Sequence, residues 1–332
     1  MNVFITFDYE IFFGAEHGST EKTILYPTNR LIEIGRKENI QFTFFIDCGF
    51  LLKLKEYGPN FPHLQEEYHE ITQQIKCLAD EGHDCELHIH PHWEKTIFNG
   101  KSWKFDYNYY KLIDFKDEEI QDIFKRYAAE LRSITNKEII SYRAGGWCLQ
   151  PFGKIKPAFK QENIKIDSSV FVGGKNMIEP YHYDFTDAPK KDMYRFSEDI
   201  VKEEETGTFI ELPITSYTYS PFFFWRLFIL GNLFPKRHKP IGNGKPMPSS
   251  GSSKFHYLTK KHKLYAGVEG YFVTKMKKIV ERNKENGFKN VVFLGHPKAL
   301  THFSLEELEK FIHKNKNKYS FQTFSKFYNE IR

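Results

Sequence analysis

Three histidines alternate with other residues in the segment ELHIHPHW, as His88, His90 and His92. Histidine is the commonest metal-ligating side chain in proteins. In a straight strand each residue advances the chain by about 3.3 Å, so His88 and His92 would lie about 13 Å apart and could not share an ion. Pro91 interrupts a strand because it has no backbone N–H to donate. We therefore expect the chain to turn there, with His88 and His92 converging on one metal ion and His90 pointing elsewhere.

Two acidic residues near the start of the chain supply what a hydrolytic metal site needs besides histidine. A catalytic zinc site combines its protein ligands with an open position for water or substrate. Asp8 and Glu10 are two residues apart, so both side chains project from the same side of a strand. One of them can bind the metal while the other stays free as a general base. His296 is a candidate general acid, and Arg143 can hold a carboxylate in its ionised form.

Each of these residues also has a structural interpretation. A pair of histidines four residues apart arises by chance, and Asp8 can cap the end of a strand. Arg143 can form an ordinary surface ion pair, and His296 can be a buried core histidine. The catalytic interpretation depends on finding all of them together at the ends of strands that the hydropathy pattern predicts independently.

Short apolar segments rich in β-branched and aromatic residues alternate with longer segments of helical periodicity. The expected strands are residues 3–7, 41–46, 84–89, 138–144, 165–170, 209–215 and 290–296, and the expected helices are residues 27–40, 66–82, 116–135, 151–164, 269–287 and 304–317. This order indicates βαβ units in an α/β fold, and about seven repeats favour a barrel over an open sheet. Asp8, His88, Arg143, Asp167 and His296 fall at the carboxyl ends of these strands, where such barrels carry their chemistry.

The sequence predicts one domain over residues 1–332 with a long insertion at about 216–265. Within it, residues 241–254 are rich in Gly, Pro and Ser and are expected to be mobile. The surrounding region from Leu212 to Val268 contains no Asp or Glu, although it holds nine basic residues: Arg226, Lys236, Arg237, Lys239, Lys245, Lys254, Lys260, Lys261 and Lys263. This imbalance favours an anionic partner, with a solvated basic loop as the alternative.

The aromatic and leucine-rich segment 221–234 is followed directly by the basic sequence PKRHK. It is too short to span a bilayer and is interrupted by Arg226. Residues 221–240 therefore suit a peripheral contact with anionic lipid. A buried apolar helix or a dimer contact is the alternative interpretation of the same segment.

Other global features narrow the class of protein. The 40% hydrophobic content fits a globular core and excludes global disorder. The N-terminus has no basic region of the kind found in signal peptides, and the four cysteines have no CxxC spacing, which favours a reducing compartment. The sequence thus predicts a cytoplasmic protein that is peripheral to the membrane if residues 221–240 contact lipid. No nucleic-acid partner is expected, because no nucleic-acid-binding module is recognisable.

Five segments, in chain order, resemble the motifs of the polysaccharide deacetylases of the NodB-homology family. They are FITFDYE, GHDCELHIHPH, YRAGGW, IKIDSSV and VFLGHP. The resemblance runs from about residue 3 to residue 300. It implies a distorted seven-stranded β/α barrel of the NodB-homology type. It also implies a divalent metal, usually Zn²⁺, and the hydrolysis of N- or O-acetyl groups on sugars.

The resemblance also implies a role for individual residues of these motifs. The implied roles are metal ligand for His88 and His92, general base for Asp8, positioning of that base for Arg143, general acid for His296, partner of His296 for Asp167, and oxyanion donor through the backbone N–H for Gly146. On this basis we expect a metal-dependent deacetylase acting on an acetylated sugar of a surface polysaccharide or its precursor. A hydrolase of another non-peptide C–N bond, such as that of an N-formyl sugar, is the alternative enzyme.

One position departs from the family pattern. The family's second aspartate, a metal ligand, is replaced here by Tyr9. Glu10 is the expected substitute ligand, because it shares a face with Asp8 and reaches one methylene further. If Glu10 does not bind the metal, Asp8 must do so and the base is missing. The protein would then be a non-catalytic, carbohydrate-binding relative.

Overall fold

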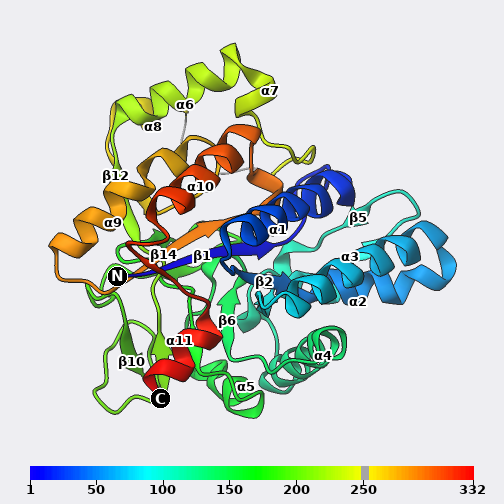
Figure 1. The fold of residues 1–332 in the computed structure, drawn as a ribbon. Helices are drawn as coiled ribbons and strands as arrows, with labels where there is room; N and C mark the ends of the chain where they lie inside the picture. The colour runs from blue at the N-terminus through cyan, green and yellow to red at the C-terminus, as the bar shows by residue number, and fades with distance from the viewer. Residues whose placement is uncertain (248–253) are drawn as a thin grey trace.

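A curved sheet flanked by helices organises the computed structural model, which describes residues 1–247 and 254–332 (Figure 1). Seven strands run parallel, in the spatial order β14 (Asn290–Gly295), β1 (Asn2–Tyr9), β2 (Thr43–Asp47), β3 (Asp84–Ile89), β6 (Ser141–Ala144), β7 (Ile166–Asp167) and β11 (Phe209–Glu211). The short β10 (Tyr194–Phe196) adds to β11 in the antiparallel direction, and β15 (Ser320–Phe321) pairs with the start of β1. The central strands are buried on both faces, as their continuous apolar sequences require.

Irregular backbone joins the two edges of the parallel sheet. The N–H of Thr215, just beyond β11, donates to the carbonyl of Val292 in β14 at 3.0 Å. The N–H of Leu294 donates to the carbonyl of Ala266 at 3.0 Å, and Gly267 forms an isolated parallel bridge with Leu294. The distorted seven-stranded β/α barrel expected from the sequence is therefore confirmed.

Helices cover the outside of the barrel. They are α1 (Tyr26–Glu38), α2 (Cys48–Tyr57), α3 (Pro62–Asp80), α4 (Asp117–Thr135), α5 (Lys156–Gln161), α9 (Met276–Glu285), α10 (His302–Asn315) and α11 (Phe324–Ile331). The helix α4 shows why the sequence forms them. Its first turn carries three acids, which stabilise a helix N-terminus, and it ends at Asn136 in the left-handed conformation. The sequence pattern missed α2, because α2 begins directly after β2 without a turn residue between them.

The segment expected to form an insertion is a small unit at one end of the molecule (Figure 1). Its strands β12 (Ser216–Tyr219) and β13 (His262–Tyr265) form an antiparallel pair. Between them lie α6 (Pro221–Leu233), α7 (Pro235–His238) and α8 (Lys254–Thr259). Among the described residues, no helix has both the length and the apolarity needed to cross a bilayer.

Part of the segment expected to be mobile is held against the barrel. The N–H of Ile241 donates to the carbonyl of Leu300 at 2.8 Å, and the N–H of Lys245 donates to the carbonyl of Glu16 at 2.7 Å. A side chain on Gly242 would collide with the carbonyl of Lys298, so glycine allows this close approach. Residues 241–247 are therefore packed in place, contrary to expectation, whereas residues 248–253 lie outside the described residues.

Replacing Phe4 by alanine tests the packing of the C-terminal helix on β1. The Phe4 ring is fully buried and lies edge-on to Phe324 and Phe327 of α11, at centroid distances of 5.4 and 5.2 Å. We expect Phe4→Ala to lower the free energy of unfolding by about 3–5 kcal/mol, measured by urea denaturation. The control Ile97→Ala, at a side chain that is 55% exposed, should change it by about 0.5 kcal/mol or less. Equal effects of the two substitutions would contradict this packing.

Candidate functional site

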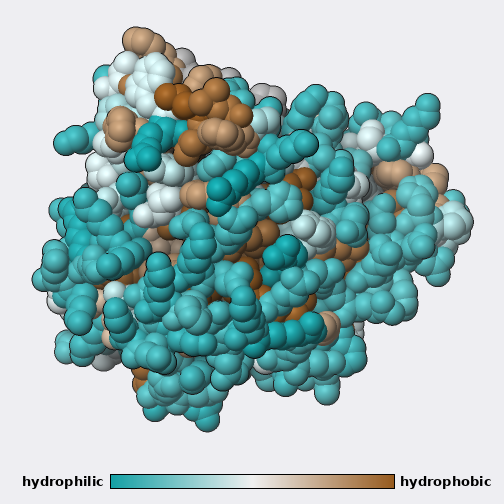
Figure 2. All heavy atoms as spheres, turned by 45° about the horizontal axis from the view of Figure 1, so that its top comes forward, coloured by the Kyte–Doolittle hydropathy of each residue, from teal (hydrophilic) through white to brown (hydrophobic). Residues whose placement is uncertain are grey.

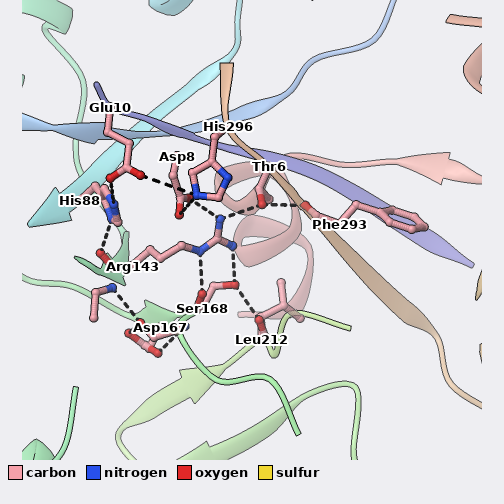
Figure 3. Close-up of polar contacts among 12 residues, drawn as sticks. Thr6, Asp8, Glu10, His88, Arg143, Asp167, Ser168, Leu212, Phe293 and His296 are labelled. Atoms are coloured by element: carbon pink, nitrogen blue, oxygen red, sulfur yellow. Dashed lines mark hydrogen bonds and ion pairs between the residues drawn. The ribbon is translucent and has the colours of Figure 1, made fainter. Parts of the chain in front are cut away.

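A cavity of about 580 Å³ opens where the carboxyl ends of β1, β3, β6 and β14 meet. Parallel strands of a barrel end at the same rim, so residues far apart in the sequence are brought together there. Of the residues singled out in the sequence, those that line this cavity are Asp8, Glu10, His88, His90, Gly146 and His296. Figure 3 shows how the side chains of Asp8, Glu10, His88 and His296 converge.

Glu10, His88 and His90 form one compact cluster. Each offers a ligand atom, and these atoms all lie within 4.8 Å of one another. The Nε2 atoms of His90 and His88 lie 2.5 Å and 3.2 Å from Oε2 of Glu10. All three side chains are buried. Two imidazoles and one carboxylate form a donor set that zinc and related divalent ions accept.

The structure exchanges the positions expected for His90 and His92. The strand β3 ends at Ile89, but His90 keeps an extended backbone with φ −105° and ψ 96°. His88 and His90 are therefore two residues apart in extended chain, on the same face and about 6.6 Å from each other. His88 and His92 cannot meet in a straight strand, as expected from the sequence. His88 and His90, two residues apart, need no turn to meet.

The turn at Pro91 is present, but it carries His92 away from the cluster. Residues Pro91–Lys95 form a short 3₁₀ helix. The ring of His92 stacks on Tyr110, with centroids 5.5 Å apart and planes at 5°, and lies edge-on to Phe13. Burial lowers the pKa of His92 well below its ordinary value, so the ring is neutral. His92 thus packs within an aromatic layer behind the site.

The charges in the cluster suit a cation held by neutral imidazole and ionised carboxylate. Burial alone would raise the pKa of Glu10, but Lys298 and the two histidines outweigh it, and the pKa lies well below its ordinary value. The Nζ atom of Lys298 lies 2.8 Å from Oε1 of Glu10. Burial lowers the pKa of His90 to about 4, which keeps its ring in the neutral form that metal binding requires.

His88 is oriented by the neighbouring strand. Its Nδ1 donates to the carbonyl of Arg143 at 2.7 Å, which turns Nε2 toward Glu10. Such a hydrogen bond from the second ring nitrogen is typical of metal-binding histidines. Burial alone would lower the pKa of His88, but Asp8, Glu10 and Asp47 together raise it to about 9. The surroundings of this ring therefore favour positive charge, and a bound metal cation would take the place of the proton on Nε2.

Asp8 is held beside the cluster by a fully buried arginine. The NH1 group of Arg143 donates to Oδ1 of Asp8 and to Oγ1 of Thr6, both at 2.8 Å (Figure 3). Its Nε and NH2 groups donate to the carbonyl and hydroxyl oxygens of Ser168 at 2.7 and 3.0 Å. The second oxygen of Asp8, Oδ2, lies 3.7 Å from Nε2 of His296. The carboxylate is thus fixed through one oxygen and presents the other to the cavity.

The partner of His296 is Glu269 and not Asp167. Nδ1 of His296 donates to Oε1 of Glu269. Asp167 is fully buried and accepts hydrogen bonds from the N–H and hydroxyl of Ser169 at 2.8 and 2.9 Å, so it fixes the turn after β7. The expected pairing of Asp167 with His296 is therefore wrong. The parallel bridge between Gly267 and Leu294 places the segment that contains Glu269 beside β14, so that Glu269 reaches His296.

The sequence did contain a signal for Glu269. It is the first acidic residue after the acid-free region that ends at Val268. Burial alone would lower the pKa of His296, but Glu269 raises it above the ordinary value, and Asp8 and Glu10 add to this effect. Glu269 thereby favours the protonated imidazole.

Gly146 occupies a position that requires glycine. Its backbone has φ 58° and ψ 20°, in the left-handed region. A Cβ atom there would lie 2.6 Å from the hydroxyl oxygen of Tyr110. The backbone of Gly146 therefore approaches the cavity without a side chain between them.

Aromatic side chains that were not predicted from the sequence form much of the remaining cavity wall. They are Phe12, Phe13, Tyr110, Trp147, Tyr181 and Tyr265. Residues of the insertion, including Lys239, Gly242 and Met247, also line the cavity, together with Lys298. Apolar rings with a few convergent polar groups are the usual lining of a small-molecule site.

Comparisons with known proteins bear on the fold. A protein from Mycobacterium smegmatis, described as a "putative polysaccharide deacetylase", matches with a TM-score of 0.54 and 13% sequence identity, over 100% of this chain and 90% of that one. The chain has the polysaccharide deacetylase fold. No family model and no curated protein matches its sequence.

Two further solved structures resemble the polysaccharide deacetylase fold of this chain more distantly. The Bc1960 peptidoglycan N-acetylglucosamine deacetylase matches with a TM-score of 0.43 and 14% identity, over 97% of this chain and 86% of that one. BA3943 from Bacillus anthracis, a CE4 family pseudoenzyme, matches with a TM-score of 0.40 and 10% identity, over 97% of this chain and 63% of that one.

Replacing Glu269 by glutamine tests its pairing with His296. Removing the carboxylate charge takes away the largest cause that raises the pKa of His296. We therefore expect Glu269→Gln to lower this pKa, measured from the imidazole proton shifts in an NMR titration. Asp167→Asn is the matched control and should leave the pKa unchanged. The opposite result, with only Asp167→Asn moving the pKa, would restore the pairing expected from the sequence.

Proposed function

We propose that this protein is a metal-dependent hydrolase that removes an N- or O-acetyl group from a sugar of a surface polysaccharide or its precursor, with residues 1–332 as one catalytic domain. The observation that carries the proposal is that the two carboxylates in the cavity have different partners. Glu10 clusters with His88 and His90, which leaves Asp8 on Arg143 with one oxygen facing the cavity. The fold agrees with this proposal.

The replacement of the family's second aspartate by Tyr9 does not remove a carboxylate from the cluster. The hydroxyl of Tyr9 donates to the side-chain carbonyl of Gln74 at 2.8 Å, on the buried side of β1 away from the cavity. Glu10 is the next residue that projects toward the cavity, and it lies against both histidines. This arrangement supports an active enzyme over a non-catalytic relative.

Glu10, His88 and His90 would hold the metal ion. The donor set fits a divalent ion, because the pKa of Glu10 keeps it ionised and that of His90 keeps it neutral. Two histidines and one glutamate are a known ligand set of catalytic zinc sites. When bound, such an ion polarises an acyl carbonyl and makes a water molecule more acidic.

Asp8 would act as the general base. Its ion pair and hydrogen bond with Arg143 fix the direction of the carboxylate. Oδ2 of Asp8 would take the proton of the attacking water. The backbone N–H of Gly146 would donate to the oxygen that becomes negatively charged as the acyl carbon turns tetrahedral.

His296 would act as the general acid. Its Nδ1 is bound to Glu269, and its Nε2 lies 3.7 Å from both Asp8 and Glu10 at the cavity. An acid must carry its proton before the leaving group departs, and the raised pKa of His296 provides this. Nε2 would then give the proton to the sugar nitrogen or oxygen that leaves. The aromatic cavity wall offers flat apolar faces for the sugar ring.

Replacing Asp8 by asparagine tests the base. We expect Asp8→Asn to lower kcat by about 10²–10⁴-fold, because asparagine cannot accept the proton, while the bound metal content stays the same. Acetate release from N-acetylated sugar oligomers and elemental analysis of the protein measure the two quantities. The control Asp187→Asn lies on an exposed turn and should leave both unchanged. Undiminished turnover by Asp8→Asn would exclude Asp8 as the base.

A matched pair of histidine substitutions tests the metal ligands. We expect His90→Phe to weaken zinc binding by more than about 100-fold, because it removes a ligand and not merely an outer partner. His92→Phe keeps the aromatic stacking on Tyr110 and should leave zinc affinity nearly unchanged. Competition with a chromophoric chelator measures both affinities. If only His92→Phe weakened binding, the ligand set expected from sequence spacing would be correct after all.

A further inference from the structure

The helix α6 presents large apolar side chains to solvent. Phe222, Trp225, Ile229 and Leu233 are 68%, 47%, 45% and 67% exposed, and Phe234 directly after the helix is 57% exposed. Their spacing of three or four residues places those within α6 along one stripe. A helix on a protein surface normally turns polar residues outward, so this stripe has the composition of a buried face.

The opposite face of α6 is firmly packed. Phe223 and Phe224 are buried. Phe223 lies against Tyr219 of β12, with ring centroids 4.7 Å apart, and Phe224 lies against Tyr257 of α8, at 5.1 Å. Within the outward stripe, Trp225 also ties α6 to α8, because its indole N–H donates to the carbonyl of Leu258 at 3.1 Å. The insertion therefore holds α6 with its apolar stripe facing outward.

Basic side chains stand at both ends of this stripe. Lys236 and Lys239 follow the C-terminal end of α6, and Lys260 and Lys261 follow α8, which packs beside its N-terminal half. In the described part of the chain none of these four lysines forms an ion pair. Figure 2 shows a patch of apolar surface at this end of the molecule.

We propose that α6 and its basic ends form a docking surface for an anionic lipid membrane. Thirteen residues give a helix about 20 Å long, which is too short to span a bilayer and suited to lying in the interface. Aromatic and leucine side chains would enter the boundary between headgroups and acyl chains, while the lysines bind anionic headgroups. The region from Leu212 to Val268 contains no acid that would repel the anionic headgroups.

The same charges argue against a second copy of this chain as the occupant. Two molecules joined through α6 would bring lysines of both copies to one interface. With no acid in the region from Leu212 to Val268, nothing in that region would compensate them. An anionic bilayer supplies both the apolar layer and the negative charge that this surface lacks.

The docking surface and the cavity share Lys239, and the chain that follows it reaches the cavity wall at Gly242 and Met247. Docking would therefore hold this wall of the cavity near the bilayer. The consequence that the acetylated sugar is itself carried at the membrane rests on the proposed function, whereas the docking does not.

Vesicle sedimentation with the full-length protein tests the proposal. We expect binding to vesicles that contain phosphatidylglycerol and not to vesicles of phosphatidylcholine alone, with binding reduced by added salt. The double variant Phe222→Ser/Leu233→Ser should bind about tenfold or more weakly. The control Ile97→Ser/Met177→Ser, at side chains 55% and 49% exposed elsewhere, should bind as the unaltered protein does.

Two independent variants show whether weaker binding reflects the docking surface and not loss of folding. Lys260→Glu/Lys261→Glu should abolish binding, whereas Lys125→Glu on the exposed face of α4 should not. Trp225 is the most exposed of the four tryptophans, and Trp93 and Trp103 are buried, so a blue shift of fluorescence on adding anionic vesicles should be absent in Trp225→Phe. Failure of the unaltered protein to bind, or equal binding to neutral vesicles, would overturn the proposal.

Sedimentation velocity without lipid tests whether a second copy of this chain covers α6 instead. A stable dimer that Phe222→Ser/Leu233→Ser dissociates would overturn the proposal in favour of self-association. Acetate release from a water-soluble oligosaccharide should be unchanged in this double variant, because α6 contributes nothing to the reacting groups. If the unaltered protein released no acetate but bound anionic vesicles, the proposed function would fail and the docking surface would stand.

Discussion

The buried guanidinium of Arg143 is the constraint on which the site depends. A charged group removed from water costs several kcal/mol unless its donors are paired. Arg143 is fully buried, and its donors reach Thr6 and Asp8 in β1 and Ser168 after β7. In the sheet β6 and β1 are separated by β3 and β2, about 14 Å in a flat sheet. The ion pair with Asp8 therefore crosses the interior, and it can form only because the sheet curls into a barrel.

The same residue organises the cluster beside it. The carbonyl of Arg143 accepts the hydrogen bond from His88 Nδ1, while its side chain holds Asp8. One backbone position thus orients a proposed metal ligand and the proposed base together. Because Asp8 is committed to Arg143, Glu10 is the carboxylate left to meet His88 and His90. A change in the curvature of the sheet would disturb both parts of the site at once.

The insertion contributes more to the site than its position in the sequence suggests. Its flanking residues close the barrel between β11 and β14 and bring Glu269 to His296. Residues 239–247 form a wall of the cavity, and α6 forms the proposed docking surface. The region from Leu212 to Val268 contains no acids, so the charged side chains that it places at the docking surface are all positive. The carboxylates at the reacting centre come from other parts of the chain.

Hydropathy and local periodicity determined the strands, most of the helices and the placement of Asp8, Arg143 and His296, because parallel strands of a barrel end at one rim. The predicted strand 84–89 agrees with β3, and the predicted helix 116–135 with α4, to within a residue. The exchange of His90 for His92 depended on the backbone beyond β3, and the pairing of Glu269 depended on a bridge between Gly267, outside the named strands, and Leu294 in β14. Neither leaves a periodic pattern in the sequence. Packing across the barrel decides them, and only the tertiary structure contains it.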